Sequence, residues 1–278
     1  MKELSLLSPA ETLLILDPTQ ATAEQLARLT FLDLVLRKIL VLEIRDTAPH
    51  NPNKTKNLRK SVSIGSNFKN YRPTKNESIF LKPFVRDSAL KISLRNLIKV
   101  AFEGIESSND YKLNYVYNKQ ISPYFSASLL QLLMGVKRLN QNGIKLQKRI
   151  SEFLNSTDKE LRSNKQHTNN LQEKLLAIHG NILLLKHMDH RSFKVLDESD
   201  NRKSVIQKKE DSAYYDYGLL YMIDSHGPQY NFGVLAATHT TFSNTMDSLD
   251  SFDSSASDST GASDSGGCSG CGGCGGCS

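Results

Sequence analysis

The chain has 278 residues and a mass of 31.1 kDa, which is enough for one or two domains with hydrophobic cores. The first 237 residues hold 35 basic and 24 acidic side chains, a net charge of +11, whereas residues 238–278 hold five Asp and no Lys or Arg. No run of about 18 apolar residues exists, which excludes a membrane-spanning helix of ordinary composition. Acidic residues interrupt the first 17 positions and all four cysteines lie in the last eleven, so we expect no signal peptide and a cytoplasmic location.

The first 46 residues predict helix, turn, helix and strand. Ser8, Pro9 and Glu11 form an N-cap, a first-turn proline and a first-turn carboxylate, which predicts a helix over 9–16. Thr22 and Gln25 form a capping box before a second helix, whose apolar stripe continues to position 39. A short β-like run follows at 40–44. This order predicts a winged-helix-like first unit at 1–46, although two helices of an ordinary bundle fit the periodicity equally well.

Residues 47–76 are basic and contain no Asp or Glu. We interpret this span as a mobile basic loop or a long wing, with Phe68 and Tyr71 as apolar or stacking anchors. Uncompensated cations attract polyanions, so the partner predicted for this span is nucleic acid or an anionic lipid head group. A solvated loop without function is the alternative. The candidate polyanion-binding residues are Lys54, Lys56, Arg59, Lys60, Lys69, Arg72 and Lys75.

Residues 77–237 are predicted to be a helical body with short strands. Strands are expected at 79–85 and, from the alternation of Tyr111, Leu113, Tyr115 and Tyr117, at 111–117. Helices are expected at 90–105, 126–139, 144–154 and 168–179, with a turn at 142–143 and a polar hinge at 155–167. A hairpin is expected from 182–185 and 193–196, and a last element at 212–224. The predicted fold class is therefore mainly α with short β-hairpins.

The last segment, 238–278, is rich in Ser, Asp and Gly and is predicted to be a disordered tail from about residue 240. It ends in a C-x2-C-x2-C-x2-C tip made of Cys268, Cys271, Cys274 and Cys277. Thiolates at this spacing suit one Zn²⁺ ion or approach an iron–sulfur ligand pattern. The tip lacks the intervening loop of structural zinc sites, so covalent modification or intermolecular disulfide formation are alternatives.

The sequence contains no nucleophile elbow, phosphate-binding loop or zinc-protease motif. The pair His187 and His190, and the run Asp224-Ser225-His226, have suitable residue types but not a diagnostic context. We therefore expect a non-enzymatic binding or adaptor protein that acts through its basic surface. The alternatives are a metal- or redox-linked protein that uses the cysteine tip, an enzyme whose site the sequence does not reveal, and a protein that binds another protein.

The segment LDLVLRKILVLE at 32–43 lies in a region, residues 8–46, that resembles the beginning of the Golgi phosphoprotein family. The corresponding residues are Leu32, Leu34, Leu36, Arg37, Ile39 and Leu42, whereas Lys38 replaces a glycine of that family. The Gly/Cys-repeat ending looks like that of groups of uncharacterised bacterial proteins with GGC-rich C-termini. Both resemblances imply a helical body with small β-wings. The family's phosphoinositide-holding residues are not recognised in this chain.

Overall fold

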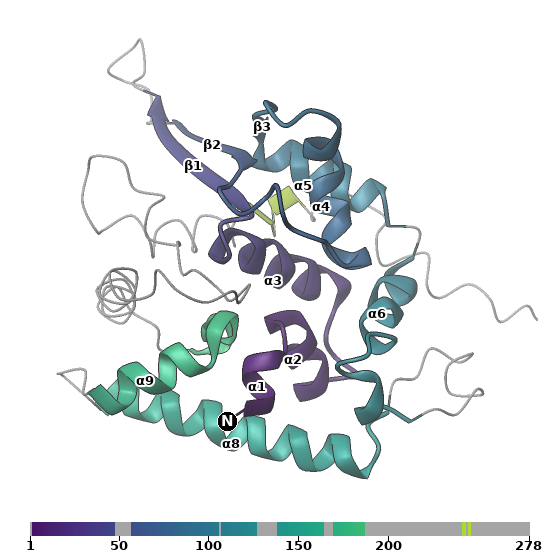
Figure 1. The fold of residues 1–278 in the computed structure, drawn as a ribbon, viewed down its shortest axis with the longest axis vertical. Helices are drawn as coiled ribbons and strands as arrows, with labels where there is room; N and C mark the ends of the chain where they lie inside the picture. Colours follow the sequence, from purple (N-terminus) through teal and green to yellow (C-terminus); the bar gives the residue numbers. More distant parts are fainter. Residues whose placement is uncertain are drawn as a thin grey trace, which may run out of the picture.

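A computed structural model describes residues 2–47, 57–105, 107–126, 138–163, 169–186, 241–242 and 244–245. Within them 65% of the residues are helical, and a small three-stranded antiparallel sheet completes the fold (Figure 1). The predicted fold class, mainly α with short β-structure, is confirmed.

The elements run in the following order. They are α1 (Lys2–Leu6), α2 (Pro9–Leu16), α3 (Ala23–Leu36), β1 (Leu40–Thr47), β2 (Asn57–Ile64), α4 (Lys75–Arg86), β3 (Ile92–Ser93), α5 (Leu94–Glu103), α6 (Ser108–Val116), η1 (Ser122–Tyr124), α8 (Gln141–Ser163), α9 (Asn169–Ala177) and η2 (His179–Leu184).

The two capping boxes predicted near the start of the chain are present. The Ser8 side chain accepts a hydrogen bond from the Glu11 amide at 3.3 Å, and the Ser8 amide donates to the Glu11 carboxylate at 2.8 Å. Thr22 and Gln25 make the same reciprocal pair at the start of α3. These local signals fix the starts of α2 and α3, and α2 ends where the sequence predicts, before Asp17.

Among the described residues of 47–76, the predicted loop is wrong at 47 and 57–64, which are strand, and at 75–76, which begin α4, whereas 65–74 form no helix or strand. Residues 57–64 form β2, which pairs antiparallel with β1 from Leu40 opposite Ile64 to Thr47 opposite Asn57. The short strand β3 pairs with the other edge of β2 and gives the sheet order β1-β2-β3. The alternative interpretation, a wing, is nearer to the observed hairpin. Because β1 belongs to the predicted first unit, residues 1–46 share this sheet with the segment that follows them.

Two predicted strands are helices. Residues 79–85 lie in α4, whose buried side chains Ile79, Phe80, Leu81 and Phe84 follow a helical period despite the internal Pro83. Residues 111–116 lie in α6, where Tyr111 and Tyr115 stack edge to face across one turn with ring centroids 5.5 Å apart. A short alternation of tyrosines fits both periods, and here tertiary packing selects the helix.

Helix α8 is longer than predicted. The expected turn at 142–143 and the first part of the expected hinge at 155–167 both lie inside α8, which is continuous to Ser163. Gly143 is required by packing, because a Cβ there would lie 2.2 Å from the Tyr124 carbonyl oxygen. The helices predicted at 90–105, 144–154 and 168–179 are confirmed, the first and last with shorter bounds. Residues 182–184 belong to the 3₁₀ helix η2 and not to a strand.

Several predictions fall outside the described residues. They concern most of the helix at 126–139, the pair His187 and His190, the segments 193–196 and 212–224, the Asp224-Ser225-His226 run, and the cysteine tip. In the part of the chain that is described, no helix is both long and apolar enough to cross a bilayer.

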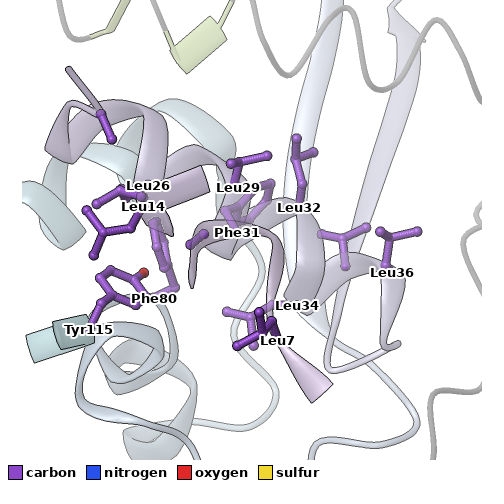
Figure 2. Close-up of a cluster of buried hydrophobic side chains, with 14 of the residues drawn as sticks. Leu7, Leu14, Leu26, Leu29, Phe31, Leu32, Leu34, Leu36, Phe80 and Tyr115 are labelled. Atoms are coloured by element: carbon purple, nitrogen blue, oxygen red, sulfur yellow. The ribbon is translucent and has the colours of Figure 1, made fainter. Parts of the chain in front are cut away.

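The buried apolar residues of all these elements form one hydrophobic cluster. Helix α3 crosses its centre and contacts α2 on one side and α4 and β1 on the other, while α8 packs beneath α2 (Figure 1). Figure 2 shows leucines of α2 and α3 gathered around Phe31 and Phe80. The side chains labelled there are Leu7, Leu14, Leu26, Leu29, Phe31, Leu32, Leu34, Leu36, Phe80 and Tyr115.

The C-terminal segment contributes to this core, although a disordered tail was predicted from about residue 240. Phe242 has no exposed surface, and its ring centroid lies 5.5 Å from that of Phe31 and 6.4 Å from that of Phe80. Thr245 is also buried. The prediction of disorder from residue 240 is therefore wrong for the described residues of 241–245.

Candidate functional site

The structure separates the seven predicted polyanion-binding residues. Arg59 and Lys60 are neighbours on β2, so their side chains leave opposite faces of the hairpin. Lys69 and Arg72 lie in the segment 65–74 between β2 and α4, and Lys75 is the first residue of α4. Lys54 and Lys56 lie outside the described residues.

Exposure distinguishes these cations further. Arg59, Lys69, Arg72 and Lys75 are exposed. Lys69, Arg72 and Lys75 follow one another between β2 and the start of α4, and we call these three the basic strip. Lys60 is half-buried, and its ammonium group donates a hydrogen bond to the Thr241 hydroxyl at 2.5 Å. Burial lowers the pKa of Lys60. Lys60 therefore contacts the C-terminal segment, and we leave it out of the strip.

Phe68 and Tyr71 are apolar anchors, the first of the two predicted alternatives, and not exposed stacking anchors. Each is partly buried against the core. The Tyr71 hydroxyl accepts a hydrogen bond from Arg37 Nη1 at 2.8 Å and donates one to Glu77 Oε1 at 2.6 Å. The Arg37 guanidinium also lies 4.9 Å from the Tyr71 ring centroid. The packing of Phe68 and Tyr71 holds the segment 65–74 against the core. The cations of this segment, Lys69 and Arg72, remain exposed to solvent.

Arg37, at the end of α3, is the centre of a buried ionic network. Its Nε lies 3.0 Å from Asp33 Oδ2, one turn earlier, and its Nη2 donates to Glu77 Oε1 on α4. We call Arg37, Asp33, Glu77 and Tyr71 the Arg37 network. It joins α3, the segment 65–74 and the start of α4, and so it positions the basic strip.

Glu77 also closes a third capping box, with Thr74 at the start of α4. The Thr74 amide donates to Glu77 Oε2 at 2.7 Å. Burial alone would raise the pKa of Glu77, but Arg37, the Tyr71 hydroxyl and the Thr74 amide outweigh it and hold that pKa below its usual value. Glu77 is therefore ionised in the folded protein at neutral pH.

Asp33 and Glu11 respond to burial in the opposite direction. Burial raises the pKa of Asp33 to about 6, and the nearby Arg37 only partly offsets this effect. Burial likewise raises the pKa of Glu11 despite the two hydrogen bonds from Ser8. Three buried carboxyl groups thus differ in proton affinity, because Glu77 accepts from Arg37 and Tyr71 on Oε1 and from the Thr74 amide on Oε2.

These groups line a polar cavity of about 430 Å³ between the α1–α2 junction, α3, the start of α4 and the end of α6. Its wall includes Glu11, Asp33, Arg37, Tyr71, Glu77 and Asn118. Lys75, a member of the basic strip, also lines this cavity and is exposed. The strip and the cavity therefore meet at Lys75.

A second hollow, of about 720 Å³, lies between η1 and α8 and was not foreseen from the sequence. Lys145, Lys148 and Arg149 line it at helical spacing. Arg149 pairs with Glu3 at 2.7 Å and Lys148 lies 3.9 Å from Glu152, so acidic residues compensate part of this charge.

The sequence did not single out the cavity residues as a site. Glu11 was recognised only as a first-turn carboxylate and Arg37 only through a resemblance. The available signal was Asp33, a carboxylate within the apolar stripe of a buried helix, followed by Arg37 one turn later. Among the described residues, no three His, Cys, Asp or Glu side chains are placed to hold a metal ion. The cysteine tip lies outside them, so zinc or iron–sulfur binding there stays a prediction.

No family model, curated protein or solved structure matches this chain.

Proposed function

We propose that this protein is a non-enzymatic binding protein that attaches to a phosphate-bearing polyanion through the basic strip. The observation that carries the proposal is the positive charge of residues 57–75, which hold five cations and no Asp or Glu. Four of those cations are exposed. The nearby acidic groups Asp33 and Glu77 are buried and face Arg37, so they do not neutralise the strip.

Recognition by the strip rests on charge. The aromatic rings of Phe68 and Tyr71, which would stack on unpaired bases, pack against the core instead. Lysine and arginine side chains then contact phosphate groups, which lipid head groups and nucleic acids both carry. Such binding is independent of sequence and weakens as salt rises.

The test measures binding of the full chain to three probes. They are neutral phosphatidylcholine vesicles, the same vesicles containing phosphatidylserine, and a duplex DNA. We expect binding to one anionic probe, with an affinity that falls at least about tenfold between about 50 and about 200 mM salt. Neutral vesicles should not bind. The anionic probe that binds identifies the source of the phosphate.

A matched pair of variants locates the site. Lys69→Glu with Arg72→Glu should weaken binding at least about tenfold, because two phosphate contacts become repulsions. Lys145→Glu with Lys148→Glu changes the net charge equally, on α8, and should change affinity less than about threefold. An equal loss in both variants would assign binding to overall charge and overturn the proposed strip. Failure of both anionic probes to bind would overturn the function.

A further inference from the structure

The polar cavity has the size and depth of a small-molecule site. Its volume of about 430 Å³ lies within the range of ligand pockets, roughly 300–1,000 Å³. Four segments of the chain converge on it, and polar side chains from each of them face it. Such a cavity selects its ligand by the charge and hydrogen-bonding character of its wall.

The inner wall is rich in acceptors and negative in charge. Glu11, Asp33 and Glu77 are all buried there, whereas the cavity's other cation, Lys75, is exposed and Arg37 is the half-buried partner of two carboxylates. Arg37 directs its donors to Asp33, Glu77 and Tyr71. No ion pair joins it to Glu11 among the described residues.

Glu11 is therefore a buried carboxylate without a cationic partner in the described part of the chain. Its side chain is 3% exposed. Its hydrogen-bond donors are all neutral: the Ser8 amide at 2.8 Å, the Ser8 hydroxyl at 3.0 Å and the Asn118 side-chain amide at 2.5 Å. A buried carboxylate normally has a cation or several charged donors, because removing it from water is costly.

We infer that the cavity is a binding site for a small molecule that carries an ammonium or guanidinium group, with Glu11 as the carboxylate that receives it. A cationic donor between Glu11 and the Arg37 network would supply the missing counter-charge. The neutral lining groups, such as Asn114 and Asn118, then hydrogen-bond the rest of the molecule. This inference is independent of the polyanion proposed for the basic strip, whose ligand carries the opposite charge.

The probes are three four-carbon compounds that differ in charge: 1,4-diaminobutane, 1,4-butanediol and succinate. Isothermal titration of the full chain should give a dissociation constant for the diamine below about 1 mM. The diol should bind at least about tenfold more weakly, and succinate should not bind. Equal or tighter binding of succinate or the diol, or no binding of the diamine, would overturn the inference.

Glu11→Gln tests the assigned acceptor. Glutamine at this position still serves a capping box, so the start of α2 is retained while the charge is lost. Diamine affinity should fall about 30-fold or more, as expected when one partner of a buried charged pair is neutralised. Glu103→Gln makes the same charge change at a side chain that is 59% exposed and should leave the affinity within about twofold.

A second variant keeps the test decisive if Glu11→Gln unfolds. Asn114→Phe fills the cavity from α6 and leaves Glu11 and its partners in place. It should abolish diamine binding as well. If the diamine bound Glu11→Gln and Asn114→Phe as tightly as the unaltered chain, its site would lie elsewhere. Lys69→Glu with Arg72→Glu should not weaken diamine binding, which separates this result from that for the basic strip.

Discussion

Asp33 shows how one buried side chain connects distant parts of this chain. Its Oδ2 faces Arg37, while its Oδ1 lies against Gly180 of η2, where a Cβ would be only 2.3 Å away. Glycine at 180 is therefore needed for the close approach of η2 to α3. Asp33 is 2% exposed, and its Oδ1 has no hydrogen-bond partner among the described residues, so the charged form is poorly solvated.

We predict that Asp33 makes the stability of the protein fall as the pH rises. The folded-state pKa of about 6 lies above the ordinary value of 3.8, so the folded protein binds the proton more tightly than the unfolded chain. The resulting stabilisation is complete below about pH 4 and is lost as the pH rises through about 6, a change of about 3 kcal/mol.

The measurement is urea denaturation of the unaltered chain and of Asp33→Asn across this pH range. The difference in unfolding free energy between the two chains should shift by about 3 kcal/mol against the unaltered chain. Glu11 and Glu77 also face Asp33, but both remain in the variant and largely cancel from the difference. A difference that stayed constant with pH would show that Asp33 titrates normally.

Among the elements, the β1–β2 hairpin and the segment 65–74 depend on the turn that ends α3. Lys38 has a positive φ of 53°, and its carbonyl oxygen accepts a hydrogen bond from the Asn67 amide at 3.1 Å. The Gly65 amide donates to the Ile39 carbonyl at 2.9 Å. A Cβ on Gly65 would lie 2.0 Å from the Lys38 carbonyl oxygen, so only glycine allows the backbones to come this close.

Gly65→Ala should therefore destabilise the protein by about 2–3 kcal/mol, because the backbone must move to relieve the overlap. Gly104→Ala is the matched control: its Cβ would lie 3.4 Å from the nearest atom, and we expect a change within about 0.5 kcal/mol. Urea midpoints at constant slope provide the comparison. Equal stability of the two variants would contradict the close approach at Gly65.

The sequence predicted those elements whose ends carry local signals. The caps at Ser8 and Thr22 placed α2 and α3, and the apolar stripe of α5 was visible. Thr74 and Glu77 also form a capping box, at the start of α4. It was not predicted, because Thr74 lies in the span 47–76 that was interpreted as a loop. Pro83 predicted a break, but helix α4 continues through it. The burial of one face of α4 stabilises the helix more than the hydrogen bond lost at Pro83 destabilises it.

The candidate site was harder to predict than the elements around it. Glu11 and Glu77 have a sufficient local explanation as capping residues, so nothing in the pattern indicates that both face one cavity. Their meeting depends on α3, which packs against both α2 and α4 and brings Arg37 between them. The amino-acid composition predicted a positively charged segment. The exclusion of Lys60 from the basic strip depends on its contact with Thr241, which the composition does not indicate.

On the scale of the whole molecule, the core is completed by a residue distant in sequence. Phe242 packs against Phe31 of α3 and Phe80 of α4, and the three rings form one aromatic cluster (Figures 1 and 2 show the surroundings). The chain therefore contacts the body again at the described residues of 241–245. Composition misled here, because one buried aromatic side chain fixes a polar segment that has no periodicity of its own.

Two truncations and one substitution test this attachment. A chain that ends at His239 loses Phe242 and should be less stable than the full chain by about 3–5 kcal/mol, the cost of removing a buried phenylalanine. Phe242→Ala in the full chain should lose a similar amount, whereas Tyr117→Ala, at an aromatic side chain that is 61% exposed, should lose less than about 1 kcal/mol.

A chain that ends at Thr245 keeps the docked residues and should match the full chain within about 1 kcal/mol, because the sequence beyond it offers few apolar groups. Urea denaturation of the full chain and of the four altered chains gives the unfolding free energies. If ending the chain at His239 left the unfolding free energy unchanged, Phe242 would contribute nothing to the core, and the body would be complete without its C-terminal segment.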